Sequence, residues 1–191
     1  TYVNSSASVK ARSTICCTSA NVVKVVNSLP EDEILMVPDK NLARYAAAHT
    51  EKKLHLWDGY CPFHNLLRAE DVKKARQDHP DAVFMAHPEC RLEVLELADI
   101  VTSTSGMLTY AAESDRKSFI VGTEVGLLYP LRQVNPEKKF HPASLAMECR
   151  DMKKITLEDI ERCLRNLEGQ VKVPEDVRKP ALNAVQKMIE L

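Results

Sequence analysis

Two short segments hold most of the side chains whose types and spacing suggest chemistry. Residues 61–64 (Cys-Pro-Phe-His) place a thiol and an imidazole three positions apart, directly after an apolar run that is predicted to be a strand. Cysteine followed by proline is common at iron–sulfur sites, because proline stiffens the turn and removes a competing N–H donor. Residues 87–90 (His-Pro-Glu-Cys) add an imidazole, a carboxylate and a second thiol, and such a set can supply an acid and a base.

Each segment also has a plainer interpretation. By itself, the first fits a loop cysteine that serves only as a small hydrophobic side chain. The second fits a solvated loop in which Glu89 favours the N-terminus of the following helix. Cys90 begins an apolar helix and is predicted to be packed rather than to bind a metal.

The remaining cysteines of the six differ in their surroundings. Cys149 lies in a polar stretch, where a purely structural cysteine is less expected. Cys163 lies beside the apolar stripe of a predicted amphipathic helix, which predicts packing in a core. Cys16 and Cys17 alternate faces of a strand-like run and are both predicted to be structural. There is no C-x-x-C and no spacing typical of a secreted disulfide framework, which favours a reduced, cytosolic protein.

The elements that must position these residues follow one repeated pattern of a short β-rich apolar run, a polar loop and apolar residues at helical spacing. The six runs span residues 15–17, 34–37, 53–57, 82–86, 99–101 and 118–121. This repetition predicts an α/β fold built of three-layer α/β/α domains with short parallel sheets. The predicted domains cover residues 1–80 and 81–150, followed by a C-terminal helical extension over 151–191.

The helical extension has its own pattern. Thr156 is predicted to cap a helix with one apolar stripe, and a last helix follows. The stripe consists of Leu157, Ile160, Leu164 and Leu167, and the last helix runs through Leu182, Val185 and Ile189.

Ligands of open parallel sheets lie beyond the carboxyl ends of the strands, where loops enter helix N-termini. Residues 102–106 (Thr-Ser-Thr-Ser-Gly) form such a loop, and its hydroxyls, its amides and the helix dipole favour an anion. A simple Ser/Thr helix cap explains the same residues. The pattern indicates a small acidic metabolite, and it suits a phosphate equally well.

Composition narrows the class of protein further. The 191 residues are 45% hydrophobic and 28% charged, which is typical of a globular protein with one or two cores. A formal net charge of -1 provides no field that attracts nucleic acid or an anionic membrane, and no apolar run approaches the length of a membrane span. Residue 1 is Thr and no signal segment precedes the first motif, so we expect the numbering to start inside a longer natural chain.

Together these segments resemble the quinolinate synthase family of the A type, whose members depend on a [4Fe-4S] cluster. The resemblance runs in order along nearly all 191 residues, and it is this combination that is specific. The matching stretches are residues 2–7 (Tyr-Val-Asn-Ser-Ser-Ala), 18–21 (Thr-Ser-Ala-Asn), 38–42 (Pro-Asp-Lys-Asn-Leu), 59–64 (Gly-Tyr-Cys-Pro-Phe-His), 79–82 (His-Pro-Asp-Ala), 87–90, 103–107 (Ser-Thr-Ser-Gly-Met), 122–124 (Gly-Thr-Glu) and Cys149 ahead of 152–157 (Met-Lys-Lys-Ile-Thr-Leu).

The resemblance implies three similar α/β domains around a central cavity, of which this chain has the second and third. It also implies a [4Fe-4S] cluster held by one cysteine from each domain, with the fourth iron open to substrate. Cys61 and Cys149 match two of these ligands, and the third is expected upstream of Thr1. The extra cysteines that precede the third ligand in some relatives are absent, so no redox-switch disulfide is expected there.

The implied reaction condenses iminoaspartate with dihydroxyacetone phosphate to quinolinate, releasing phosphate and water, in cytoplasmic de novo NAD biosynthesis. An aspartate-oxidising enzyme is the implied source of iminoaspartate, and neither nucleic acid nor a membrane is an expected partner. Glu89 is assigned as acid/base, with Tyr2 and His64 as a proton-transfer pair. The implied substrate-binding residues are Tyr2, Val3, Asn4, Ser19, His87, Pro88, Glu89, Ser103 and Thr104.

These assignments predict that the cysteines, His64, His87, Glu89, Ser103 and Thr104 converge on one cavity, with Tyr2, Asn4 and Ser19 on its wall. One alternative is a truncated family member that folds or binds dicarboxylates without chemistry. In keeping with it, we expect the 191 residues alone to hold iron poorly and to form no quinolinate. Another alternative is a zinc hydrolase that uses His64, His87 and a cysteine, although their spacing fits no closed zinc motif.

Overall fold

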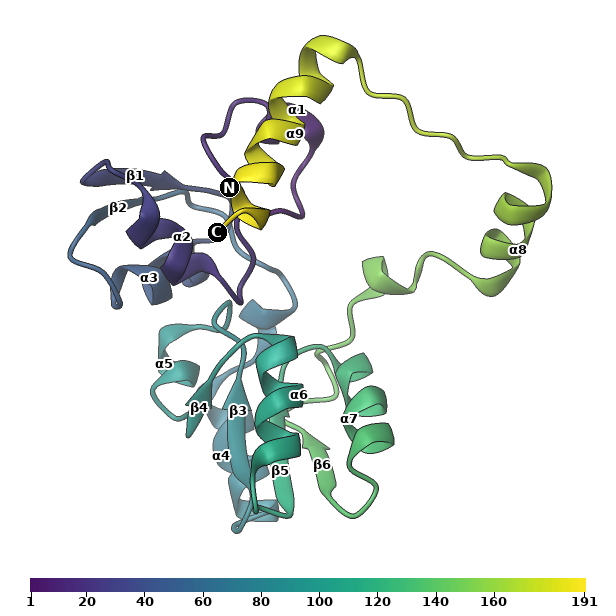
Figure 1. Cartoon of the computed structure of the whole chain (residues 1–191). Helices are drawn as coiled ribbons and strands as arrows, with labels where there is room; N and C mark the ends of the chain where they lie inside the picture. Colours follow the sequence, from purple (N-terminus) through teal and green to yellow (C-terminus); the bar gives the residue numbers. More distant parts are fainter.

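All strands of the protein run parallel and form two separate sheets (Figure 1). The computed structural model describes residues 1–191. The first sheet pairs β1 (Glu33–Met36) with β2 (Lys53–Leu56). The second has the order β4-β3-β5-β6, formed by β3 (Val83–Ala86), β4 (Ile100–Val101), β5 (Ser118–Gly122) and β6 (Lys139–Pro142). The predicted α/β fold with short parallel sheets and C-terminal helices is confirmed.

Five of the six predicted runs form strands, and the strand predicted at residues 15–17 is wrong. Cys17 makes only an isolated parallel bridge with Tyr2. Tyr2 in turn donates its N–H to the carbonyl of Val37, just beyond β1, at 2.9 Å. Tyr2 and Cys17 therefore continue the edge of the first sheet through isolated backbone hydrogen bonds. They form no ladder long enough to be a strand.

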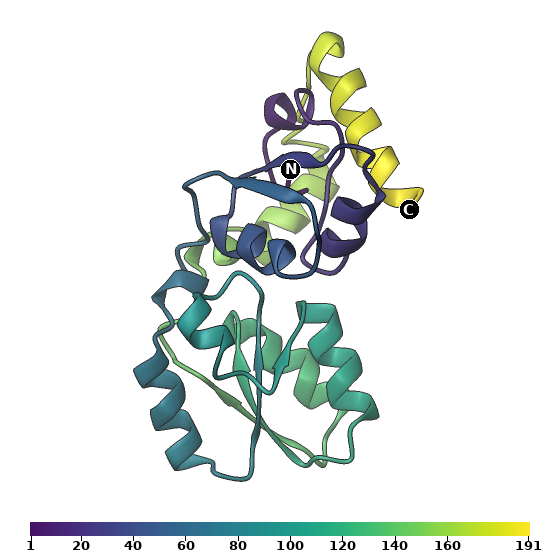
Figure 2. The ribbon, with the colours of Figure 1, turned by 90° about the vertical axis from the view of Figure 1, so that its left-hand side faces the viewer.

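The first unit packs helices on its sheet around one core. α2 (Val22–Ser28) and α3 (Lys40–Ala47) contribute Val22, Val25 and Leu42 to this core, where they meet Met36 of β1. On another side of this unit, the short helix α1 (Ala7–Lys10) contacts the last helix α9 (Glu175–Ile189). The C-terminal helix thus returns to the first unit, and both chain ends lie there (Figures 1 and 2).

The second unit has three layers, because its strands alternate side chains between two cores. Phe84 and Ile120 face one core, which α4 (Ala69–Asp78) and α5 (Leu92–Leu95) cover. Met85 and Phe119 face the other, under α6 (Thr104–Glu113) and α7 (Leu128–Val134). Single 3-10 turns follow three strands: η1 (His64–Leu66), η2 (Val125–Leu127) and η3 (Arg150–Lys153). Helix α4 precedes residue 80 in the sequence but packs on this second sheet. The predicted domain boundary at residue 80 stays a prediction.

Helix α8 (Leu157–Asn166) stands apart from both units (Figure 1). Its predicted cap is confirmed, since the Thr156 side chain accepts the N–H of Asp159 and the Asp159 carboxylate accepts the N–H of Thr156. Its apolar stripe has no cover, as Leu157 is 80% exposed and Leu164 is 73% exposed. No helix of the protein is both long and apolar enough to cross a membrane.

The contrast between the buried Leu42 of α3 and the exposed Leu164 of α8 gives a prediction with a matched control. Leu42→Ala should lower the free energy of unfolding by about 2–5 kcal/mol, because Leu42 is fully buried and its loss leaves a cavity. Leu164→Ala should change it by less than about 0.5 kcal/mol, because this side chain lies in solvent. Urea unfolding followed by circular dichroism measures both variants. Equal losses of unfolding free energy in the two variants would show that α8 packs against another part of the protein in solution.

Candidate active site

A cavity of about 910 Å³ lies where the two units meet. Its lining includes residues that follow the carboxyl end of each of the six strands, which is where parallel sheets bind ligands. Asp39 follows β1, Cys61 follows β2, His87 follows β3, Thr104 follows β4, Thr123 follows β5 and Cys149 follows β6. The side chain of Asn41 on α3 also joins the units, because it donates to the carbonyl of Glu89 at 3.1 Å.

The cavity brings together nine of the twelve residues that the sequence singled out. Those that line it are Tyr2, Asn4, Ser19, Cys61, His64, His87, Glu89, Thr104 and Cys149. Val3, Pro88 and Ser103 do not line it. The Ser103 hydroxyl instead caps α6, where it accepts the N–H of Gly106 at 3.1 Å. The catalytic, metal-binding and substrate-binding roles assigned to all twelve residues stay predictions.

His64 lies at the centre of a buried polar cluster. Its Nδ1 is 3.0 Å from the Oε2 of Glu89 and 3.2 Å from the Sγ of Cys61. Its Nε2 is 2.9 Å from the hydroxyl of Thr123. His64 follows the first sheet in sequence and Glu89 follows β3, so this cluster spans the two units and fixes the imidazole from both ring nitrogens.

Burial and charge set opposite protonation states for the two histidines. Burial alone would lower the pKa of His64, but its bonds to Cys61 and Glu89 outweigh this effect and raise the pKa to about 9. His87 stacks on His64 with ring centroids 4.3 Å apart. Burial and the nearby His64 charge lower the pKa of His87 well below its ordinary value. His64 is therefore a cation at neutral pH and His87 is neutral, with its Nδ1 accepting the N–H of Glu89 at 3.3 Å.

Tyr2 lies on the wall of the cavity as a neutral phenol. Burial, followed by the negative charge of Glu89, raises the pKa of Tyr2 above its ordinary value. The site thus combines a carboxylate, a protonated imidazole and a phenol. Such a set can both remove a proton from a substrate carbon and return one to a substrate oxygen.

Sequence reasoning missed two buried carboxylates on this cavity, those of Asp39 and Glu124. Burial raises the pKa of Asp39. Burial acts in the same direction on Glu124, but Lys153 and backbone N–H groups outweigh it and lower the pKa. Both residues follow a strand and begin a helical segment, a position at which a carboxylate is expected to accept backbone N–H groups. That signal was present in the sequence.

Comparison with known sequences identifies the family. The family model of quinolinate synthetase A proteins matches residues 1–190. This chain belongs to that family. Quinolinate synthase of Geotalea uraniireducens is 53% identical over 191 residues, which cover all of this chain and 63% of the relative. Quinolinate synthase 1 of Methanosarcina acetivorans is 51% identical over 188 residues, 98% of this chain and 62% of that protein. The chain thus spans just over three fifths of the length of these curated relatives.

The quinolinate synthetase A family implies an iron–sulfur cluster, and the donors on the cavity fit part of its ligand set. Cys61 and Cys149 both line the cavity and are half-buried. Ligand atoms of Cys61, His64 and Glu89 lie within 4.8 Å of one another. No other cysteine of the chain lines this cavity. The chain therefore offers two of the three thiolates that the resemblance implies.

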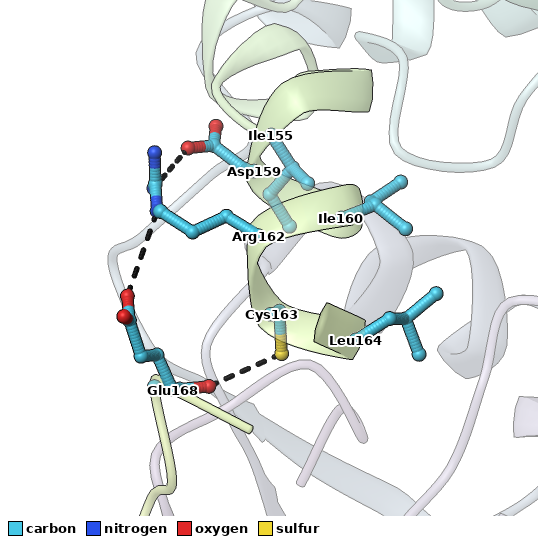
Figure 3. Close-up of a pocket in the computed structure, with 8 residues that line it drawn as sticks. Ile155, Asp159, Ile160, Arg162, Cys163, Leu164 and Glu168 are labelled. Carbon is cyan, nitrogen blue, oxygen red and sulfur yellow. Dashed lines mark hydrogen bonds and ion pairs between the residues drawn. The ribbon is translucent and has the colours of Figure 1, made fainter. Parts of the chain in front are cut away.

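The other cysteines lie elsewhere, and one prediction about them is wrong. Cys16, Cys17 and Cys90 are buried, as predicted. Cys163, which was predicted to pack in a core, is exposed on α8, where its thiol donates to the carbonyl of Glu168 at 3.1 Å. It lines a hollow of about 500 Å³ along α8 beside Ile160 (Figure 3). The prediction fails because an apolar stripe implies a core only when another element of the chain covers it.

These environments predict an order of thiol reactivity. Cys163 should react first with iodoacetamide, and the half-buried Cys61 and Cys149 should follow. Cys17 should react slowest together with Cys90, because burial raises the pKa of Cys17 to about 11 and that of Cys90 further. Time-resolved alkylation with peptide mass spectrometry measures each site. Rapid alkylation of Cys90 in the folded protein would contradict the described core.

Proposed function

We propose that this chain carries the quinolinate synthase site of its family, which condenses iminoaspartate with dihydroxyacetone phosphate to quinolinate in NAD biosynthesis. The observation that supports the proposal is the buried His64–Glu89 pair beside Cys61, in a cavity that also holds Cys149. The reaction releases phosphate and water, so it requires several proton transfers within one enclosed site.

The charge of each side chain sets its proposed role in the proton transfers. In our proposal the Glu89 carboxylate removes a proton from the substrate carbon, and the His64 imidazolium lies 3.0 Å away. The Tyr2 phenol is the group that returns a proton to a departing oxygen. Ser19, Asn4 and Thr104 on the cavity wall hold the substrate carboxylates by hydrogen bonds. A [4Fe-4S] cluster held by Cys61 and Cys149 would supply an open iron that acts as a Lewis acid.

A second candidate is binding of dicarboxylates without chemistry. The observation that favours it is that only two cysteines, Cys61 and Cys149, line the cavity. In that case the hydroxyl and amide groups of the cavity wall bind a diacid, but no complete cluster forms.

Anaerobic reconstitution of two proteins separates these functions. One is the 191-residue chain, and the other is the same chain joined to the upstream part of the Geotalea quinolinate synthase. We expect the joined chain to bind iron and sulfide and to form quinolinate, while the shorter chain holds little iron. Equally low iron in both would contradict the proposal, and zinc in place of iron would favour the hydrolase alternative. Diacid binding by both without quinolinate would favour the second candidate.

A further inference from the structure

The segment that carries Cys149 has little regular structure, and after the buried Met147 it forms hydrogen bonds to the rest of the chain through one side chain. Apart from the short turn η3, it forms neither helix nor strand between β6 and α8. Within residues 149–154, Asp151 pairs with Lys154, and every hydrogen bond and ion pair to the rest of the chain goes to Glu124. The Oε1 of Glu124 accepts the N–H of Cys149 at 3.3 Å and pairs with the Nζ of Lys153 at 3.0 Å.

The other oxygen of Glu124 anchors this carboxylate to its own unit. Oε2 accepts the N–H of Gly126 at 2.8 Å, at the start of η2. A Cβ at Gly126 would lie 2.5 Å from this oxygen and 2.9 Å from the Nζ of Lys153. A side chain at this position would therefore displace the carboxylate of Glu124 or the Nζ of Lys153. Glu124 is 8% exposed, so solvent competes little for these bonds.

Asp39 makes the same arrangement around Cys61 in the first unit. Its Oδ1 accepts the N–H of Leu42 at 2.7 Å and caps α3. Its Oδ2 accepts the N–H of Cys61 at 2.6 Å. Asp39 is 4% exposed. In each unit, a buried carboxylate thus accepts the backbone N–H of the cavity cysteine. The same carboxylate caps the helical segment that follows the preceding strand of that sheet.

The order of elements around the two cysteines is also the same. In the first unit, β1 leads to Asp39, a helix, β2 and then Cys61. In the second unit, β5 leads to Glu124, a helix, β6 and then Cys149. Two equivalent contacts at equivalent places in two units indicate a common role in placing the thiols.

We propose that Asp39 and Glu124 are positioning residues that fix the two cavity cysteines by accepting their amide N–H groups. The inference rests on the proposed function where it treats Cys61 and Cys149 as cluster ligands. The backbone contact itself is independent of any cluster. It sets where each thiol points before a metal arrives, so that ligand geometry is established by the protein.

Amide hydrogen exchange of the 191-residue chain tests the contact directly. Glu124→Ala should speed exchange of the Cys149 amide about tenfold, as expected for the loss of a hydrogen bond to a charged group, and leave that of Cys61 unchanged. Glu124→Gln keeps an acceptor oxygen and should restore most of the protection. For Cys61 the variant is Asp39→Ser, because serine still caps α3 but is too short to reach the cysteine.

Matched controls are the exposed carboxylates closest in sequence to each cysteine. Asp58→Ala and Glu148→Ala remove the same charge near Cys61 and Cys149 without removing an amide contact, and should leave both exchange rates unchanged. Unchanged exchange at Cys149 in Glu124→Ala would overturn the inference. An equal rise in β5 and β6 would also overturn it, because it would show loosening of the whole unit.

Iron retention in the joined chain then separates this inference from the proposed function. Glu124→Ala and Asp39→Ser should each lose iron to a chelator several-fold faster than the unchanged joined chain. If amide exchange accelerates while iron loss stays the same, the positioning contact stands and the cluster role of that cysteine fails. If amide exchange does not change, the positioning contact fails whatever the iron content.

Discussion

Glu89→Gln in the joined chain should reduce the rate of quinolinate formation by about 10²–10⁴-fold, the range for loss of a general acid or base. Glutamine has nearly the same shape as glutamate, but it cannot take up a proton at neutral pH. The substitution also removes the anion 3.0 Å from the Nδ1 of His64, so the imidazole loses one of the partners that keep it protonated. Two of the three groups assigned to proton transfer are therefore impaired at once.

The matched control for this substitution is Glu93→Gln. Glu93 lies four residues later on α5, is exposed and pairs only with Arg91 at 3.5 Å. The Glu93→Gln substitution should leave the rate of quinolinate formation unchanged. Iron content is measured in both variants, because a lower rate with a full cluster places the defect in the chemistry. A Glu89→Gln rate within about threefold of the unchanged joined chain would contradict the role of Glu89 as acid/base.

The sequence predicts the part of the cavity lining that directly follows a strand. Residues that directly follow a strand must lie at the carboxyl edge of its parallel sheet, so periodicity alone places His87 and Glu89 at the edge of one sheet and Cys61 at the edge of the other. The missed carboxylates Asp39 and Glu124 occupy the same kind of position. An acid at a helix start predicts a helix cap, but it does not by itself predict a place on the cavity or a contact with a cysteine amide.

The errors share a different cause, which is that periodicity does not show what covers an element. Residues 15–17 are as apolar as a strand, yet they form one isolated bridge, with Tyr2, and no ladder. Cys163 lies beside a regular stripe on α8, yet no other element of this chain packs on that stripe. Nor did any local pattern indicate that α9 returns to the first unit, because the contact of the Ala184 carbonyl with the N–H of Cys16 joins distant parts of the sequence.

Cys61→Ala in the joined chain should abolish the cluster, so that iron falls from about four atoms per chain to near background. A cubane with one open iron has only three protein ligands, and the loss of one leaves two irons without a thiolate. The substitution also removes the sulfur 3.2 Å from the Nδ1 of His64, while the Glu89 pair remains. Iron and sulfide analysis, together with the visible absorption of the cluster, measures the effect.

Cys149→Ala should have the same effect, although Cys149 follows β6 in the second unit and makes no hydrogen bond with His64. This equivalence distinguishes a cluster from a metal ion bound by Cys61, His64 and Glu89 alone. A single ion at that group would depend on Cys61 and not on Cys149. Cys163→Ala is the control, because this thiol is exposed on α8 outside the cavity. Loss of metal in Cys61→Ala but not in Cys149→Ala would therefore replace the cluster by a single-ion site on the same cavity.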